Sequence, residues 1–232
     1  MYKNKKILCI IPARGGSKRL PGKNIKLLNG MPLIGYAIAA AKCSQYIDKV
    51  IVSTDDETIA CVAREQEAEV PFMRPAELAL DTVHTAPVLQ HAVKQTETEG
   101  LHFDFIVLMQ PNSPGVLTQD VDSAIEELER SGANSCVSVC EITDRPERMY
   151  RMVEGRITTY VGGSQTRSQD MPKLFRLNGA VYVMTRATLM GKGVVYDDND
   201  SCVAIVMPRE RSVDIDTEFD FAIAKVLMER KI

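Results

Sequence analysis

Short apolar runs alternate with helical patterns along the first 130 residues of the chain. The runs predict buried strands over residues 6–12, 49–53 and 103–109, with a short one at 71–73. Apolar residues at helical spacing, with capping residues before them, predict helices over 32–45, 57–67, 85–97 and 119–130. This alternation is typical of an α/β domain with a mainly parallel sheet and helices on both faces.

The pattern changes after Ser135. Strands are expected over 135–141, 148–160, 180–185 and 204–207, and a closing helix over 216–229. The connection over residues 144–173 is long and polar, which predicts an inserted β-rich arm or lid. No internal repeat or linker interrupts the chain, so we expect a single domain over 1–232 that contains this arm.

Composition narrows the class of protein. The content of 45% hydrophobic and 25% charged residues is ordinary for a globular domain, and no run of 18 apolar residues predicts a membrane segment. The six cysteines form no CxxC pair, and several lie within apolar runs, which favours a reduced, cytoplasmic protein. The three histidines are not spaced to complete a zinc site with them.

The charge is distributed unevenly. The net charge of −3, without an aromatic and basic stripe, argues against nucleic-acid binding. The first 47 residues, however, contain nine Lys or Arg and no Asp or Glu. Such a basic segment in an acidic protein favours the binding of a small anion.

Most of this charge lies in a loop after the first strand, where α/β proteins bind ligands. Gly15 and Gly16 allow backbone N–H groups to approach a phosphate, and the cations suit a triphosphate. The cations are Arg14, Lys18, Arg19, Lys23 and Lys26. A solvated basic loop is the alternative, but the glycines, the preceding strand and the turn at Pro21 favour a phosphate site.

Two common phosphate-binding motifs are absent from this loop. Five residues rather than four separate Gly16 from Gly22, and Asn24 stands where a P-loop has a magnesium-binding Ser or Thr. There is no GxGxxG motif, so a dinucleotide site is not supported.

The loop from Ile11 to Asn24 resembles the signature of acylneuraminate cytidylyltransferases, also called CMP-sialic acid synthetases. Relatives that activate legionaminic acid, pseudaminic acid or Kdo share related loops. Five further segments match this family in its order: Val50–Asp56, Arg74–Leu78, Gln110–Pro114, Arg176–Ala180 and Asp214–Thr217. The resemblance therefore covers nearly the whole chain and implies a Rossmann-like nucleotide-diphospho-sugar transferase fold with a β-rich dimerisation arm.

The resemblance assigns roles to individual residues. Arg14 and Lys23 would neutralise the triphosphate, and Asn24 would contact the cytidine. The remaining nucleotide-binding residues would be Ala13, Gly15, Gly16, Ser17, Lys18, Arg74, Thr85 and Gln110. The sugar acid would meet Gln110, Arg148, Arg176, Asn178 and Tyr182, with Arg145 and Arg167 as further candidates.

Asp214 and Asp216 are spaced i, i+2, so both carboxylates point to one side of an extended segment. Carboxylates beside a triphosphate suit Mg²⁺. The alternative is that Asp216 or Thr217 caps the last helix, while Asp220 serves the N-terminus of that helix.

Two positions depart from the family pattern. Val116 and Ser168 stand where many members have Arg, in the region expected to meet substrate or a partner subunit. These changes leave the identity of the acceptor sugar open.

The implied reaction is attack of the anomeric hydroxyl of a 2-keto sugar acid on the α-phosphorus of CTP, with release of pyrophosphate. Arg14, Lys23 and Asp216 are the candidate catalytic residues, and the general base is left unassigned. A homodimer is expected, as in the family. A nucleotidyltransferase acting on Kdo or sugar phosphates and an inactive nucleotide-binding protein are the alternatives.

Overall fold

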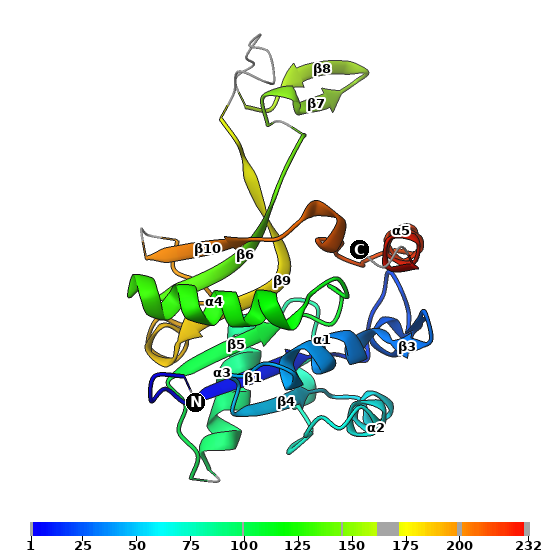
Figure 1. Ribbon diagram of the computed structural model, residues 1–232. Coiled ribbons are helices and arrows are strands. Elements are labelled where there is room, and N and C mark those ends of the chain that lie inside the picture. The colour runs from blue at the N-terminus through cyan, green and yellow to red at the C-terminus, as the bar shows by residue number, and fades with distance from the viewer. Residues whose placement is uncertain (1, 99, 145, 162–171, 199–200, 230–232) are drawn as a thin grey trace.

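A six-stranded sheet forms the centre of the computed structural model, which describes residues 2–98, 100–144, 146–161, 172–198 and 201–229 (Figure 1). The strand order is β10-β6-β9-β5-β1-β4. β1 is parallel to β4 and β5, and β10 is parallel to β6, whereas β9 runs antiparallel between β5 and β6. The mainly parallel α/β fold expected from the sequence is confirmed. The strands are β1 (Ile7–Pro12), β4 (Lys49–Ser53), β5 (Phe105–Met109), β6 (Ser135–Glu141), β9 (Phe175–Thr185) and β10 (Cys202–Val206).

Helices cover both faces of this sheet. Ile7, Cys9 and Ile11 of β1 belong to one buried cluster with residues of α1, α2 and α4, whereas Leu8 and Ile10 belong to another with residues of α3. Because both sets are buried, β1 reads as a continuous apolar run in the sequence. Within the described ranges, no helix has the length and apolar character needed to cross a bilayer. The helices are α1 (Leu33–Lys42), α2 (Glu57–Glu65), α3 (Thr85–Glu97), α4 (Thr118–Ser131) and α5 (Glu218–Glu229).

A third apolar cluster joins the basic loop to the end of the chain. Leu20 and Leu28 pack with Ile215 and with Phe221 of α5. The chain that follows Leu20 forms the short helix η1 (Lys23–Ile25) and then the antiparallel pair β2 (Leu27–Leu28) and β3 (Met31–Pro32). This packing brings the loop after β1 beside the segment that precedes α5.

The predicted arm contains a hairpin of β7 (Tyr150–Val153) and β8 (Arg156–Thr159), which stands away from the main sheet at the ends of β6 and β9 (Figure 1). The sequence indicated strand structure over 148–160 as a whole. The structure divides it at Glu154 and Gly155, whose φ angles are 49° and 77°. Two consecutive positive φ angles are characteristic of a tight two-residue hairpin turn. β9 begins at Phe175 rather than at 180 and therefore runs from the arm into the sheet.

The strand predicted at 71–73 is wrong. Only isolated bridges are present here, between Ile51 and Glu69 and between Thr54 and Met73. Pro71 and Pro75 flank the segment, and proline cannot donate a ladder hydrogen bond. The shorter structures elsewhere are the helices η2 (Ala76–Leu78), η3 (Pro146–Arg148), η5 (Thr188–Lys192) and η6 (Arg209–Arg211).

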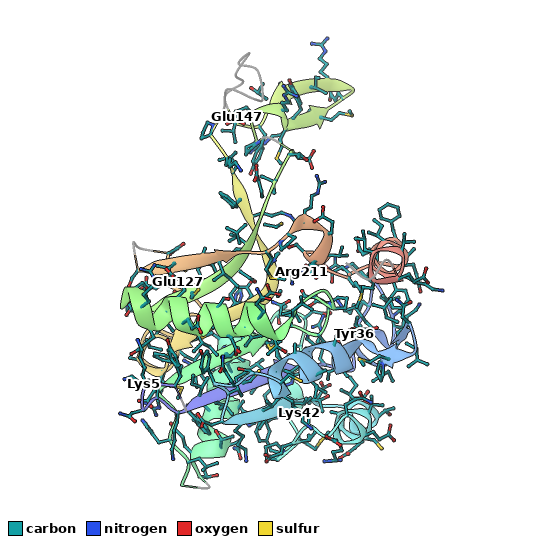
Figure 2. The ribbon with its side chains drawn as sticks, viewed as in Figure 1. Lys5, Tyr36, Lys42, Glu127, Glu147 and Arg211 are labelled. Atoms are coloured by element: carbon teal, nitrogen blue, oxygen red, sulfur yellow. The ribbon has the colours of Figure 1, made fainter. Side chains whose placement is uncertain are left out.

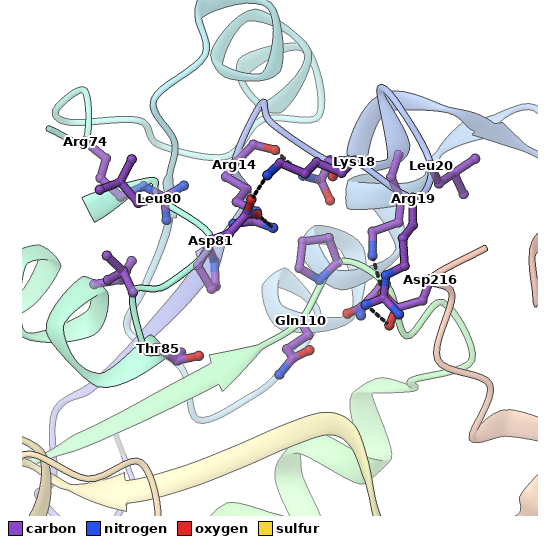
Figure 3. Close-up of a pocket in the computed structure, with 18 of the residues that line it drawn as sticks. Arg14, Lys18, Arg19, Leu20, Arg74, Leu80, Asp81, Thr85, Gln110 and Asp216 are labelled. Atoms are coloured by element: carbon purple, nitrogen blue, oxygen red, sulfur yellow. Dashed lines mark hydrogen bonds and ion pairs between the residues drawn. The ribbon is translucent and has the colours of Figure 1, made fainter. Parts of the chain in front are cut away.

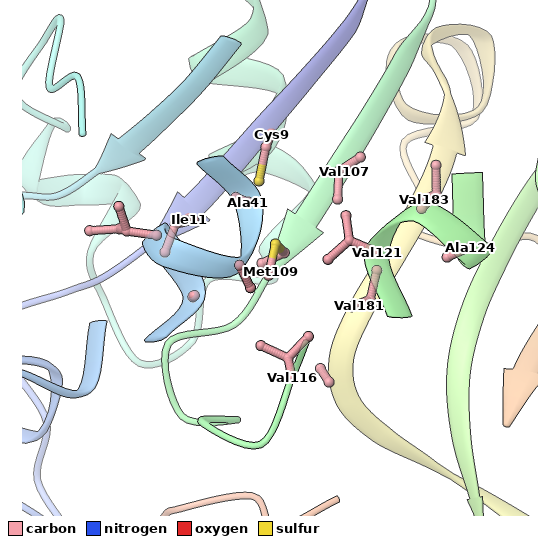
Figure 4. Packing of buried hydrophobic residues seen from close by; sticks show 14 of the residues in the cluster. Cys9, Ile11, Ala41, Val107, Met109, Val116, Val121, Ala124, Val181 and Val183 are labelled. Atoms are coloured by element: carbon pink, nitrogen blue, oxygen red, sulfur yellow. The ribbon is translucent and has the colours of Figure 1, made fainter. Parts of the chain in front are cut away.

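The loop between β5 and α4 is packed into the body of the protein. Val116 belongs to the region expected to meet substrate or a partner, but its own side chain lies in the main core with Met109 and Val181 (Figure 4). Arg211, labelled in Figure 2, donates to the backbone oxygen of Gly115 at 3.2 Å and pairs with the buried Asp120 of α4. These contacts hold the loop that carries Gln110.

Candidate functional site

A cleft of about 340 Å³ opens at the carboxyl ends of β1 and β5 (Figure 3). Pro12 ends β1 and Gln110 follows β5, and both line the cleft. This is the position at which open α/β sheets bind ligands. The structure gathers these predicted residues around it: Arg14, Ser17, Lys18, Lys23, Asn24, Arg74, Thr85, Gln110 and Asp216.

The two glycines of the basic loop have different surroundings. The N–H of Gly15 donates to Asp55 Oδ1 at 3.3 Å, and a Cβ at Gly15 would lie 2.5 Å from Asp56 Oδ2. Asp56 itself caps α2 by accepting from the backbone amides of Thr58 and Ile59. A Cβ at Gly16 would meet nothing within 4 Å. Gly15 is therefore required by close packing on the α2 cap, whereas Gly16 faces open space.

Lys23 and Asn24 fix the far side of the loop. The Lys23 side chain is 14% exposed, and its Nζ donates to the backbone oxygen of Ile215 at 2.8 Å and to Asp216 Oδ1 at 2.9 Å. Asn24 is buried, and its Nδ2 donates to the backbone oxygen of Arg14 at 2.9 Å. Arg19 adds a second cation to Asp216 at 2.8 Å. The loop is thus bound to a carboxylate from the other end of the chain.

Asp81 forms a second acidic contact with this loop. Its carboxylate lies 2.5 Å from both Arg14 Nη2 and Lys18 Nζ (Figure 3). The hydrogen bond from Lys18, followed by the charge of Arg14, holds the pKa of Asp81 below its ordinary value. Sequence analysis did not nominate Asp81, because nothing local to it indicates a pairing with residues more than 60 positions away.

Several apolar side chains and Arg74 line one side of the cleft. The apolar side chains of this wall are Leu78, Leu80, Val83 and Val88. The Arg74 side chain is 4% exposed and donates from Nη2 to Asp55 Oδ1 at 3.0 Å, whereas its buried Nε has no hydrogen-bond partner. A buried N–H without a partner is rare in folded proteins and here belongs to a residue that lines a cleft.

Asp214 and Asp216 lie on either side of the buried Ile215. Asn112, which lines the cleft, donates its amide to Asp214 Oδ1 and accepts the Ile215 N–H at 2.8 Å. Burial raises the pKa of Asp214 and the charge of Asp216 adds to this, while Lys23 and Arg176 act in the opposite direction. Asn112 was not nominated from the sequence, although its place just after β5 is a usable signal.

The N-terminus of α5 is capped by Asp220 and Thr217. Asp220 Oδ2 accepts from the backbone N–H groups of Asp216 and Thr217 at 3.1 and 2.8 Å, and Thr217 Oγ1 accepts from the Asp220 N–H. The expectation for Asp220 is confirmed. The Asp216 carboxylate is therefore not used as a cap and is directed to Lys23 and Arg19.

The predicted sugar-binding residues are placed unevenly. Arg176 is exposed on β9, with its Nη2 3.5 Å from the backbone oxygen of Ser212 and its charge acting on Asp214. Arg148 is exposed on η3 in the arm. Arg145, Arg167 and Ser168 lie outside the described residues.

Three other predicted residues are buried and do not line the cleft. Asn178 donates to Ser212 Oγ at 2.9 Å and accepts from Ser138 Oγ at 2.6 Å. Its side-chain amide is therefore hydrogen-bonded inside the protein rather than directed at a ligand. Tyr182 is buried in the middle of β9, and burial raises its pKa to about 12. Ala13 is buried in the main core.

The comparisons with known proteins identify the family. A model described as cytidylyltransferase matches residues 8–183 of the chain. The chain belongs to the cytidylyltransferase family and is a nucleotidyltransferase. The resemblance seen in the sequence is confirmed.

Several relatives match over most of the chain. It is 34% identical over 236 residues to the CMP-N,N'-diacetyllegionaminic acid synthase of Legionella pneumophila, with 97% of each chain covered. It is 33% identical to a pseudaminic acid cytidylyltransferase of Campylobacter jejuni, with 96% of each covered. An N-acylneuraminate cytidylyltransferase of Escherichia coli is 28% identical over 97% of this chain and 53% of that one.

Solved structures confirm the fold. The structure of CMP:2-keto-3-deoxy-manno-octonic acid synthetase complexed with CTP superposes with a TM-score of 0.73 and 16% sequence identity. The match covers 98% of this chain and 100% of that chain. At this identity the likeness describes the fold alone.

Proposed function

We propose that this cytidylyltransferase transfers CMP from CTP to the anomeric hydroxyl of a sialic-acid-like nonulosonic acid and releases pyrophosphate. One observation carries the proposal. The cleft at the strand ends is lined by the cations of the loop after β1 together with Asp216, whose carboxylate contacts Lys23. The relatives named for CMP-legionaminic, pseudaminic and N-acylneuraminic acid synthesis support this acceptor class.

The nucleotide would bind with its base on the apolar wall and its phosphates on the basic loop. The flat face of a pyrimidine suits Leu78 and Val88, and the unpartnered Nε of Arg74 is a donor for a carbonyl of the base. Arg14 and Lys18 supply charge-assisted hydrogen bonds for phosphate oxygens. Positioning and charge neutralisation account for most of the catalysis of phosphoryl-type transfer.

The acidic segment fits Mg²⁺ in the character of its donors. Asp214 and Asp216 offer carboxylate oxygens of the kind that Mg²⁺ prefers. Burial, followed by the charge of Asp216, raises the pKa of Asp214, and a bound cation would favour its ionised form. No cluster of three or more His, Cys, Asp or Glu occurs in the described ranges, so phosphate and water oxygens would complete the coordination. When bound, Mg²⁺ supplies neutralisation of phosphate charge. Lys23 holds Asp216 in position and would supply positive charge to the leaving phosphates.

The acceptor would lie beside Arg176 and Gln110. Arg176 is an exposed guanidinium close to Asp214, and it suits the carboxylate of a sugar acid. Gly179 adopts φ 77°, and a Cβ there would lie 3.7 Å from Gln110 Oε1, so β9 passes close to the Gln110 amide. Asn178 and Tyr182, being buried, would act by holding β9 in this position rather than by touching the sugar.

A homodimer forms part of the proposal. The arm exposes Tyr150, Met152 and Ile157, and Met152 is 74% exposed. Apolar side chains on a projecting hairpin are suited to packing on a second copy across a twofold axis. Arg148 would then approach the neighbour's acceptor site. Sedimentation should show a dimer for the wild type and a monomer for the Met152→Glu, Ile157→Lys double variant; a wild-type monomer would contradict this.

A reduced compartment suits the thiols. All six cysteines are free in the structure. This supports the cytoplasmic location expected from the sequence.

The activity is tested by Mg²⁺-dependent pyrophosphate release with CTP and a panel of nonulosonic acids and Kdo. Lys23→Ala should lower kcat/KM by about 10²–10³, as for loss of a group that stabilises transition-state charge. Asp216→Ala should lower it by about as much, because it removes a proposed Mg²⁺ ligand. Lys42→Ala, which removes a surface pair with Glu67, is the matched control and should retain activity. Turnover with sugar phosphates and GTP or UTP instead, or CTP binding without turnover of any acid, would refute the proposal.

A further inference from the structure

Asp81 comes from the segment between η2 and α3, on the opposite side of the cleft from the basic loop. Its carboxylate contacts Arg14 and Lys18, while Asp216 contacts Arg19 and Lys23 (Figure 3). The cations of the basic loop that line the cleft therefore fall into two groups, and each group is paired with one carboxylate. Asp216 has a proposed role in metal binding, whereas nothing in the proposed reaction uses Asp81.

The position of Asp81 is the position that a phosphate group would take. Guanidinium and ammonium groups form the same charge-assisted hydrogen bonds with carboxylate and with phosphate oxygens. The N–H groups of Arg14 and Lys18 that point at Asp81 are therefore withheld from a phosphate until Asp81 leaves. Its departure costs little, because Lys18 is 81% and Asp81 39% exposed, and exposed ion pairs are weak.

We propose that Asp81 is an internal competitor for phosphate at Arg14 and Lys18, and that it tunes which phosphorylated ligands the cleft retains. This inference rests on the proposed nucleotide site. A triphosphate presents enough charge and oxygen atoms to displace the carboxylate and still gain contacts at Lys23. Pyrophosphate left after transfer competes with the returning carboxylate, so Asp81 favours its release. Cytidine has no phosphate to reach these cations, so its affinity for the cleft does not depend on Asp81.

The test is equilibrium binding by calorimetry, with inorganic pyrophosphate, CTP and cytidine as probes. Asp81→Asn keeps the size of the side chain and removes its charge. The Kd for pyrophosphate and for CTP should fall by about 2- to 30-fold, which corresponds to two exposed ion pairs at the usual strength. The Kd for cytidine should stay within about twofold. Added salt should shrink the gain, since exposed charges are screened.

Glu77→Gln is the matched control. Glu77 is an exposed acid in η2, four residues before Asp81, and its removal changes the net charge by the same amount. It should alter pyrophosphate binding by less than about twofold. Asp81→Ala should lower the Kd for pyrophosphate as Asp81→Asn does, which excludes an effect specific to the asparagine side chain.

Three results would overturn the proposal. These are unchanged or weaker pyrophosphate binding in Asp81→Asn, an equal gain in Glu77→Gln, and an absence of pyrophosphate binding in both wild type and variant. Because binding needs no turnover, the two proposals fail separately. A gain in Asp81→Asn without transfer to any acid would refute only the proposed function, and normal transfer without the gain would refute only the role of Asp81.

Discussion

The contact between Gly15 and Asp56 allows a sharp test of how the basic loop is held. The three atoms nearest to a Cβ at Gly15 all belong to the Asp56 side chain, at 2.5, 2.9 and 3.1 Å. Gly15→Ala therefore forces Asp56 to move. Asp56 is the N-cap of α2, with Oδ1 2.7 Å from the Thr58 amide and 3.1 Å from the Ile59 amide, so the movement disturbs both bonds.

The magnitude follows from three contributions to the free energy of unfolding. Loss of an N-cap costs about 1 kcal/mol, and the overpacking adds about 1–3 kcal/mol. Alanine in place of glycine restricts the unfolded chain and returns about 0.4–1 kcal/mol. The net loss of stability is about 1–3.6 kcal/mol, which for a chain of this size lowers Tm by roughly 2–14 °C.

Urea unfolding followed by far-ultraviolet circular dichroism measures the effect, with Gly16→Ala as the control. Nothing lies within 4 Å of a Cβ at Gly16, so that variant should stay within about 0.5 kcal/mol of the wild type. Asp56→Gly removes all three clashing atoms at a cost of a few tenths of a kcal/mol as a cap. The double variant Gly15→Ala, Asp56→Gly should therefore recover most of the loss. Equal stability of the two alanine variants, or no recovery in the double variant, would refute the reasoning.

Two further predictions concern the body of the protein. Arg186 donates to Glu97 at 2.6 and 2.9 Å and holds the pKa of Glu97 below its ordinary value. The ion pair therefore stabilises the fold at pH values above the pKa that Glu97 has in the unfolded chain. This stabilisation is lost as the pH falls through the lower pKa of Glu97 in the folded protein. Arg186→Gln should cost about 1 kcal/mol at pH 7 and less at pH 3 in urea titrations, and equal costs would contradict it. Burial raises the pKa of Cys136 to about 12, so a disulfide reagent should modify exposed Cys43 in the native protein but Cys136 only on unfolding. Fast native modification of Cys136 would contradict its burial.

Local patterns were sufficient for much of the fold. The strands at 49–53 and 135–141 and the helix at 85–97 were predicted with their observed bounds, because each depends on a run or a period within its own residues. The strand predicted at 71–73 is absent, because only Met73 of this segment forms a bridge, to Thr54, and Pro71 and Pro75 cannot donate ladder hydrogen bonds. The order of the strands and the antiparallel course of β9 also lay beyond reach, since pairing joins residues far apart in the sequence.

The candidate site divides in the same way. The sequence alone determined that a glycine-containing basic loop follows a buried strand, and this places Arg14 and Lys23 at a ligand cleft. Only the tertiary structure decided which acids face these cations. Folding brings Asp81 to Arg14, and Asn112 to Asp214, from distant segments of the chain. Folding also buries three residues that were predicted to bind ligands: Asn178, Tyr182 and Ala13. The physical reason is that hydrophobic periodicity is a local property of the chain, whereas charge pairing and burial depend on neighbours that only the packed fold supplies.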